Sequence, residues 1–116
     1  MSKKIKVIIK QPHRVPYSTN ISNTLENLQR TVGGYIELLR PDLGVPRMAF
    51  IVNEEGKLRG LHPNFQVYGE VIAGTAVFLG LTAGKDGIEF DDIPMTFKEF
   101  KEMFPMLWLN DGEYQG

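Results

Sequence analysis

The sequence predicts an α+β domain, in which a curved, mostly antiparallel sheet of about five strands packs against two short helices. Several short segments have alternating or continuous apolar residues, as β-strands do. Two other segments begin with a helix cap and continue with apolar residues at helical spacing. Glycines at the strand ends would permit strong bending, so a partly closed barrel stays open as an alternative.

The first expected strand covers residues 4–10. Its residues Ile5, Val7 and Ile9 share one face, and lysines occupy most of the other face. Residues 11–20 contain two prolines and several small polar residues, a composition typical of a loop. The chain is therefore expected to enter the sheet as a half-buried strand and then leave it.

The first helix is expected over residues 23–32. Asn23 is the expected N-cap, and Glu26 stands three residues later, as a capping pair requires. Apolar residues then recur at helical spacing. Gly33 and Gly34 should end the helix, because glycine adopts the left-handed conformation at low cost.

Two strands and a hairpin turn are expected in the middle of the chain. Tyr35–Leu39 is the second strand, and the nearly continuous apolar run Arg47–Asn53 is the third and a candidate for the centre of the sheet. Residues 54–56 fit a short turn with Gly56 at a positive φ. Lys57–Leu61 would then be the returning strand.

The next buried strand is expected at Thr75–Leu81, which is apolar and rich in β-branched residues. A turn at Ala83–Gly87 should lead into a short edge strand at Ile88–Phe90. The sequence leaves Glu70–Ala73, between two glycines, without an assignment.

The second helix is expected over residues 96–104. Thr96 is the expected cap with Glu99 three residues later, and Pro105 should end the helix. The apolar segment 106–109 is either core or an exposed patch for a partner, and core is favoured because small domains need their aromatic residues inside. Three phenylalanines share one face of this helix: Phe97, Phe100 and Phe104.

Composition limits the class of protein. The chain has 116 residues, enough for a single domain over 1–116, and no cysteine, which excludes disulfides, thiol nucleophiles and Cys-ligated metals. The sequence has no apolar run long enough for a signal peptide or a membrane span, so an intracellular, cytoplasmic protein without membrane contact is expected. A net charge of -1 gives no general reason to expect nucleic-acid binding.

Motifs for catalysis or metal binding do not stand out. The two histidines are far apart in the sequence, and no serine lies in a nucleophile turn. Neighbouring carboxylates on turns rarely converge on one substrate. We therefore expect a non-enzyme with no catalytic residue, no metal and no cofactor.

The segment from Leu58 to Gly74 is the strongest candidate for a binding site. It places His62, Asn64, Phe65 and Tyr68 among glycines between apolar strands, and loops on a rigid scaffold often carry binding groups. In the alternative interpretation this is a structural loop in which the Asn64 side chain bonds the backbone.

A weaker candidate is a basic face near the amino terminus, formed by Lys4, Lys6, Lys10 and Arg14. Such a face could follow the phosphates of a nucleic acid, but it has no interleaved aromatic residues for base stacking. Lysines on a strand also discourage edge-to-edge aggregation, which is the simpler explanation.

Three blocks of sequence together resemble a known family: TLENLQRTVGGYIEL at Thr24–Leu38, IVNEEGKLRGLHPN at Ile51–Asn64 and YGEVIAGTAVFLG at Tyr68–Gly80. The chain resembles a domain family of unknown function, found in small proteins of bacteriophages and mobile elements, mainly in Gram-positive bacteria. The resemblance covers about residues 3–104 and leaves 105–116 as an extension. It implies a protein of the bacterial host cytoplasm and no established catalytic residue, cofactor or substrate.

Three functions follow as expectations. The first is a small non-enzymatic protein that binds a host or phage protein and modulates host functions or defence, with a homo-oligomer left open. The second is a small-molecule or nucleotide binder that uses the 60–74 loop. The third is nucleic-acid binding through the basic face.

Overall fold

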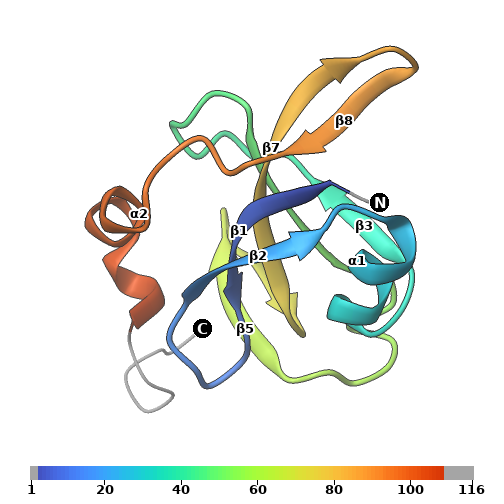
Figure 1. Ribbon diagram of the computed structural model, residues 1–116. Helices are drawn as coiled ribbons and strands as arrows, with labels where there is room; N and C mark the ends of the chain where they lie inside the picture. Colours follow the sequence, from blue (N-terminus) through green and yellow to red (C-terminus); the bar gives the residue numbers. More distant parts are fainter. Residues whose placement is uncertain (1–2, 109–116) are drawn as a thin grey trace.

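The computed structural model describes residues 3–108, which form one six-stranded antiparallel sheet, a separate two-stranded hairpin, two α-helices and a 3₁₀ turn (Figure 1). The elements in chain order are β1 (Lys4–Lys10), β2 (Tyr17–Ser22), α1 (Leu25–Val32), β3 (Ile36–Leu39), β4 (Met48–Asn53), β5 (Pro63–Val67), β6 (Glu70–Ala73), β7 (Ala76–Gly84), β8 (Gly87–Asp91), α2 (Phe97–Met103) and η1 (Pro105–Trp108). The predicted α+β class is confirmed.

Strand order in the large sheet is β2-β1-β7-β4-β3, and β8 pairs with the far end of β7. The sheet is not closed into a barrel, so that alternative was wrong. All six residues of β4 are buried, as its continuous apolar run predicted. This strand lies between β7 and β3 in the sheet. In Figure 1 the end of β7 and the whole of β8 extend beyond the body of the sheet as a two-stranded ribbon.

Both faces of the sheet are covered. On one face, α1 packs Leu28 and Val32 against Ile5, Val7 and other side chains that point to that side. On the other face, the β5–β6 hairpin and the α2–η1 segment cover a cluster that contains four phenylalanines. Figure 1 shows α1 and α2 on opposite sides of the sheet. The four phenylalanines are Phe50, Phe65, Phe78 and Phe100.

The first helix begins one residue later than the sequence pattern predicted. The hydroxyl of Thr24, not the side chain of Asn23, caps it by accepting a bond from Asn27 N at 3.2 Å. The Asn23 amide instead donates to Phe90 O at 3.0 Å and so ties the helix to β8. Glu26 pairs with Arg30 at 3.0 Å instead of completing a capping box. Gly33 ends the helix at φ 82°, as predicted.

Two assignments in the first two thirds of the chain were wrong. Residues 11–16 are a loop as expected, but the chain from Tyr17 onward is β2. The sequence pattern did not reveal this strand because its side chains are polar and backbone pairing with β1 holds it in place. Residues 54–60 form turns, so there is no strand at Lys57–Leu61. Gly56 has no positive φ; it is needed because an added Cβ would lie 2.8 Å from Ala73 O.

The unassigned segment Glu70–Ala73 is β6, the partner of β5. The two residues between these strands are Tyr68 at φ 49° and Gly69 at φ 80°. Positive φ at both central residues is the signature of a type I′ turn, whose twist matches that of the flanking strands. An aromatic residue is uncommon at the first of these positions, because its Cβ crowds the backbone there.

The second helix has the predicted cap. The Thr96 hydroxyl accepts from Glu99 N at 3.1 Å, and the Glu99 carboxylate accepts from Thr96 N at 2.8 Å. Of the apolar segment 106–109, Leu107 is buried, Trp108 is half-buried against Phe97 and Phe100, and Leu109 lies outside the described residues. No helix within residues 3–108 is long and apolar enough to cross a membrane.

We expect Thr96→Ala to lower the free energy of unfolding by about 1 kcal/mol, the usual cost of a lost N-cap.

The bond from Thr96 N lowers the pKa of Glu99. The stabilisation from this carboxylate is therefore complete above its unfolded-state pKa and is lost as pH falls through the lowered folded-state pKa. Urea unfolding of wild type and Glu99→Gln should accordingly differ at pH 7 and converge in acid. The exposed Lys98→Ala on the same helix is the control, and an equal loss there would contradict the assignment.

Candidate functional site

The residues that the sequence singled out between His62 and Tyr68 lie on the β5–β6 hairpin, but not on one surface. Asn64 is 5% exposed, and Phe65 is buried in the core cluster between Phe50 and Phe78. His62 and Tyr68 are exposed at opposite ends of β5. The four side chains therefore do not form a common pocket, but Phe65 and Tyr68 both line one cavity of about 220 Å³ beside the α2–η1 segment.

Asn64 bonds the backbone, as the alternative interpretation of the sequence had it. The pairing of β5 with β6 shifts between Pro63 and Phe65, which makes Asn64 the extra residue of a β-bulge. Its amide nitrogen donates to Lys10 O at 2.7 Å and to Gly74 O at 2.8 Å. The side chain thus connects the end of β1 to the link between β6 and β7.

His62 lies beside the loop that follows β1. Its ring meets the ring of His13 edge to face, with 5.1 Å between the ring centroids. His13 itself has a φ of 67°. No group of three or more His, Asp or Glu side chains in residues 3–108 is placed to hold a metal ion.

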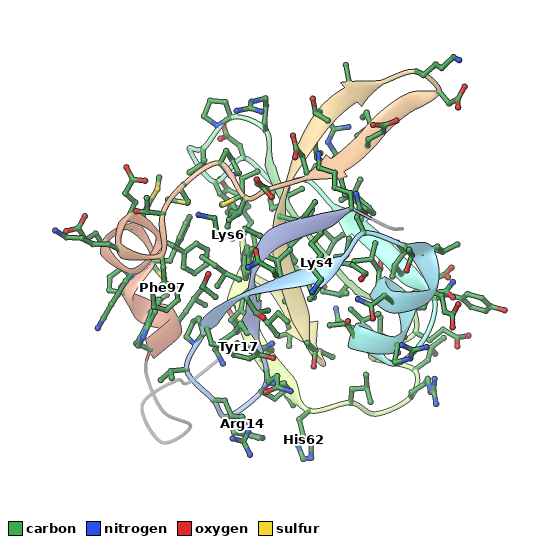
Figure 2. The ribbon with its side chains drawn as sticks, viewed as in Figure 1. Lys4, Lys6, Arg14, Tyr17, His62 and Phe97 are labelled. Atoms are coloured by element: carbon green, nitrogen blue, oxygen red, sulfur yellow. The ribbon has the colours of Figure 1, made fainter. Side chains whose placement is uncertain are left out.

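The four residues of the predicted basic face are spread apart. Lys4 and Lys6 are exposed on β1, whereas Lys10 is 4% exposed and donates through Nζ to Gln11 O at 2.8 Å. Figure 2 places Arg14 well away from Lys4 and Lys6, toward the end of the molecule where His62 lies.

Acidic residues also lie close to this part of β1. The carboxylate of Asp92 accepts a bond from Lys6 N at 2.8 Å, and Asp91 forms an ion pair with Lys3 at 3.5 Å. The bond from Asp92 N lowers the pKa of Asp91. Carboxylates at this position oppose the approach of a phosphate backbone.

A groove that the sequence did not indicate lies between β3 and β6. Its floor is made by side chains of β3 and β4, one wall is β6, and the turn over 54–58 closes one end. The groove has a volume of about 240 Å³. We call it the β3–β6 groove; its lining residues are Glu37, Leu39, Val52, Asn53, Glu54, Gly56, Lys57, Leu58, Glu70, Val71, Ile72 and Ala73.

Three carboxylates line the β3–β6 groove, those of Glu37, Glu54 and Glu70. Glu70 forms an ion pair with Lys57, and the hydrogen bond and charge of Lys57 lower the pKa of Glu70. Glu37 and Glu54 are exposed and form no ion pair with any described residue. Two carboxylates therefore remain available to a cationic group from outside.

The other end of the groove continues into a second, apolar cavity of about 190 Å³. The two cavities share Leu39, Glu70 and Ile72. Tyr68 lines the second cavity and donates a hydrogen bond from its hydroxyl to Asp42 O in the loop after β3. Together they make a continuous channel along β6, from Leu58 to Tyr68.

Exposed apolar side chains stand at both ends of this channel. Leu58 is 88% exposed and Tyr68 is 79% exposed. An exposed single apolar residue is ordinary, but two large ones at the ends of one groove form a surface suited to a partner. Of these residues, sequence reasoning singled out Tyr68, and nothing in the pattern indicated that Glu37 and Glu54 line one groove.

The family is settled by a family-model comparison. A model described as "Domain of unknown function (DUF3846)" matches residues 5–105. The chain belongs to the DUF3846 family. The match covers every element from β1 to α2 and so includes both walls of the groove in this DUF3846 domain. No curated protein and no solved structure matches the chain.

Proposed function

We propose that this DUF3846 chain is a small non-enzymatic protein of phage or mobile-element origin that acts in the bacterial cytoplasm by binding a protein partner. The observation that carries the proposal is the open channel along β6, with the carboxylates of Glu37 and Glu54 on one side and exposed Leu58 and Tyr68 at its ends. Aromatic anchors beside apolar cavities are typical of protein-binding surfaces. Modulation of host functions or defence would fit the proposed origin.

The conformation of Tyr68 adds support. An aromatic residue at φ 49° is strained, and the strain is of order 1–3 kcal/mol for such positions. Asparagine would satisfy the same turn without that cost. A strained, exposed tyrosine where asparagine would suit the turn better is consistent with selection for contact rather than for stability.

The other two expectations receive less support. A small-molecule site on the 60–74 segment would have to use the cavity of about 220 Å³ that Phe65 and Tyr68 line. Asn64 would not contribute, because its side chain is buried and bonded to backbone carbonyls. Nucleic-acid binding would have to rely on Lys4 and Lys6, with Asp92 beside them.

Site-specific photo-cross-linking in cells tests the proposal. A benzophenone amino acid at Leu58 should capture a discrete partner in a Gram-positive bacterium. The matched control carries the same group at Leu25, an equally apolar and 59% exposed leucine on α1, outside the channel. Equal capture from both positions, or capture from neither, would count against the β3–β6 groove as the binding surface.

Tyr68→Asn provides the second test. We expect the free energy of unfolding of this variant to lie within about 1 kcal/mol of the wild-type value, because relief of the strained φ offsets loss of the hydroxyl bond to Asp42 O. The cross-link from Leu58 should nevertheless weaken, since the aromatic anchor is gone. If Tyr68→Asn keeps full cross-linking from Leu58, Tyr68 is not part of the partner-binding surface.

A further inference from the structure

One edge of the large sheet is open next to the groove. β3 pairs with β4 only, and no other described strand lies along its free side. Tyr35 O accepts from Glu54 N at 2.8 Å, and the pairing continues as Ile36 with Asn53 and Glu37 with Val52. Hydrogen-bonded pairs alternate along antiparallel strands, so the backbone groups of Ile36 and Leu38 point away from β4. They form a short row of donors and acceptors that no strand within residues 3–108 uses.

Side chains of β3 alternate between the two faces of the sheet. Glu37 and Leu39 line the β3–β6 groove, whereas Ile36 and Leu38 pack on the face covered by α1. A strand added at the free edge would place every second side chain next to Glu37 and Leu39, at a cross-strand separation of about 5 Å. Two residues that are two positions apart in that strand would therefore meet one carboxylate and one apolar side chain.

Charge complementarity selects the occupant. Glu37 and Glu54 form no ion pair with any residue in 3–108, while Lys57 is paired with Glu70. A cationic side chain opposite Glu37 would be satisfied, and an anionic one would be repelled. Next to it, Leu39 and the cavity toward Tyr68 accept an apolar side chain.

We propose that the free edge of β3 binds an extended segment of a partner protein by β-strand addition, and that the segment carries Lys or Arg two residues from a large apolar residue. Main-chain bonds to Ile36 and Leu38 supply affinity, and Glu37 and Leu39 supply selectivity. The inference rests on the proposed protein-binding function and specifies its ligand.

The test is selection of a displayed library of random ten-residue peptides on the full chain. Enriched sequences should share Lys or Arg, one variable position, and a large apolar residue. For the best synthetic peptide, Glu37→Gln should weaken binding about three- to tenfold, the range for a lost charge-assisted contact at a partly exposed site. Glu55→Gln is the matched control, because Glu55 is exposed next to the groove but does not line it.

Backbone methylation separates strand addition from side-chain docking. N-methylation of alternate peptide amides should abolish binding at one set of positions and be tolerated at the other, because only every second amide faces β3. Enrichment of acidic or unrelated sequences, or equal tolerance at all amides, would overturn the inference. Concentration-dependent dimers that the peptide cannot compete would assign the edge to a second copy and also overturn it.

The two proposals fail in different ways. Cross-linking from Leu58 without any enriched peptide would reject strand addition and leave a partner that docks as a folded surface. Peptide binding that survives Glu37→Lys unchanged would reject the charge assignment alone. If a peptide with Glu in place of its Lys or Arg fails to bind wild type but binds Glu37→Lys, the charge assignment is supported.

Discussion

Replacing Phe100 with alanine should lower the free energy of unfolding by about 3–5 kcal/mol, the usual cost of removing a fully buried phenylalanine. Phe100 is 0% exposed. Its ring packs against Phe78 in the central strand at a centroid distance of 5.1 Å, and against Phe104 at 5.0 Å. It is thus the side chain through which α2 is fixed to the sheet, and its loss should leave a cavity beneath the helix.

Chemical unfolding followed by tryptophan fluorescence measures this effect, because Trp108 lies 6.1 Å from the Phe100 ring. Phe100→Leu should retain much of the burial and unfold between wild type and Phe100→Ala. Met103→Ala, at an exposed position on the same helix, should change stability by less than about 1 kcal/mol. A loss below about 1 kcal/mol for Phe100→Ala would mean that α2 does not pack as described.

Elements that are determined by their own side chains could be predicted from the local sequence. The capping box of Thr96 and Glu99 and the Gly33 stop depend on residues within one turn, and both were predicted correctly. The alternation in β1 and the apolar run in β4 reflect burial, which the sequence carries directly. The expected membership in a domain family of unknown function was confirmed by the family model over residues 5–105.

Elements held by the backbone were not predictable in this way. β2 has polar side chains and exists because the β1 edge accepts it. Gly56 was expected to serve a hairpin, but its lack of a side chain serves an approach to Ala73 O, seventeen residues away in sequence. Thr24 and Asn23 are both good caps, and the choice between them depends on the bond from Asn23 to Phe90 in β8.

The candidate site shows the same division. Tyr68 stood out because it lies among glycines between apolar strands, and it lines the second cavity of the channel. Glu37 and Glu54 did not stand out, since each is an ordinary exposed carboxylate in its own segment. They line one groove because Ile36 of β3 pairs with Asn53 of β4. Glu37 follows Ile36 and Glu54 follows Asn53, so this pairing brings the two carboxylates to the same groove.

Replacing Asn64 with leucine should lower the free energy of unfolding by about 2–4 kcal/mol, because two buried hydrogen bonds are lost and two carbonyls lose a donor. The carbonyls belong to Lys10 and Gly74, and the side chain is 5% exposed. Leucine fills a similar volume, so the loss reports the hydrogen bonds more than a cavity. Asn20→Leu, at an exposed position on β2, is the control and should change stability by less than about 1 kcal/mol.

Asn64→Asp sharpens the test because it keeps the shape and removes the donors. At neutral pH the introduced carboxylate would face two carbonyl oxygens in a buried site, so we expect a loss larger than that of Asn64→Leu. Burial raises the folded-state pKa of such a carboxyl, so the penalty is smallest below the unfolded-state pKa and grows as pH rises above it. The gap between wild type and Asn64→Asp should therefore widen from pH 3 to pH 7. A gap that stays constant would show that Asn64 is not enclosed by β1, β5 and β6, and would return it to the surface as a candidate ligand-binding residue.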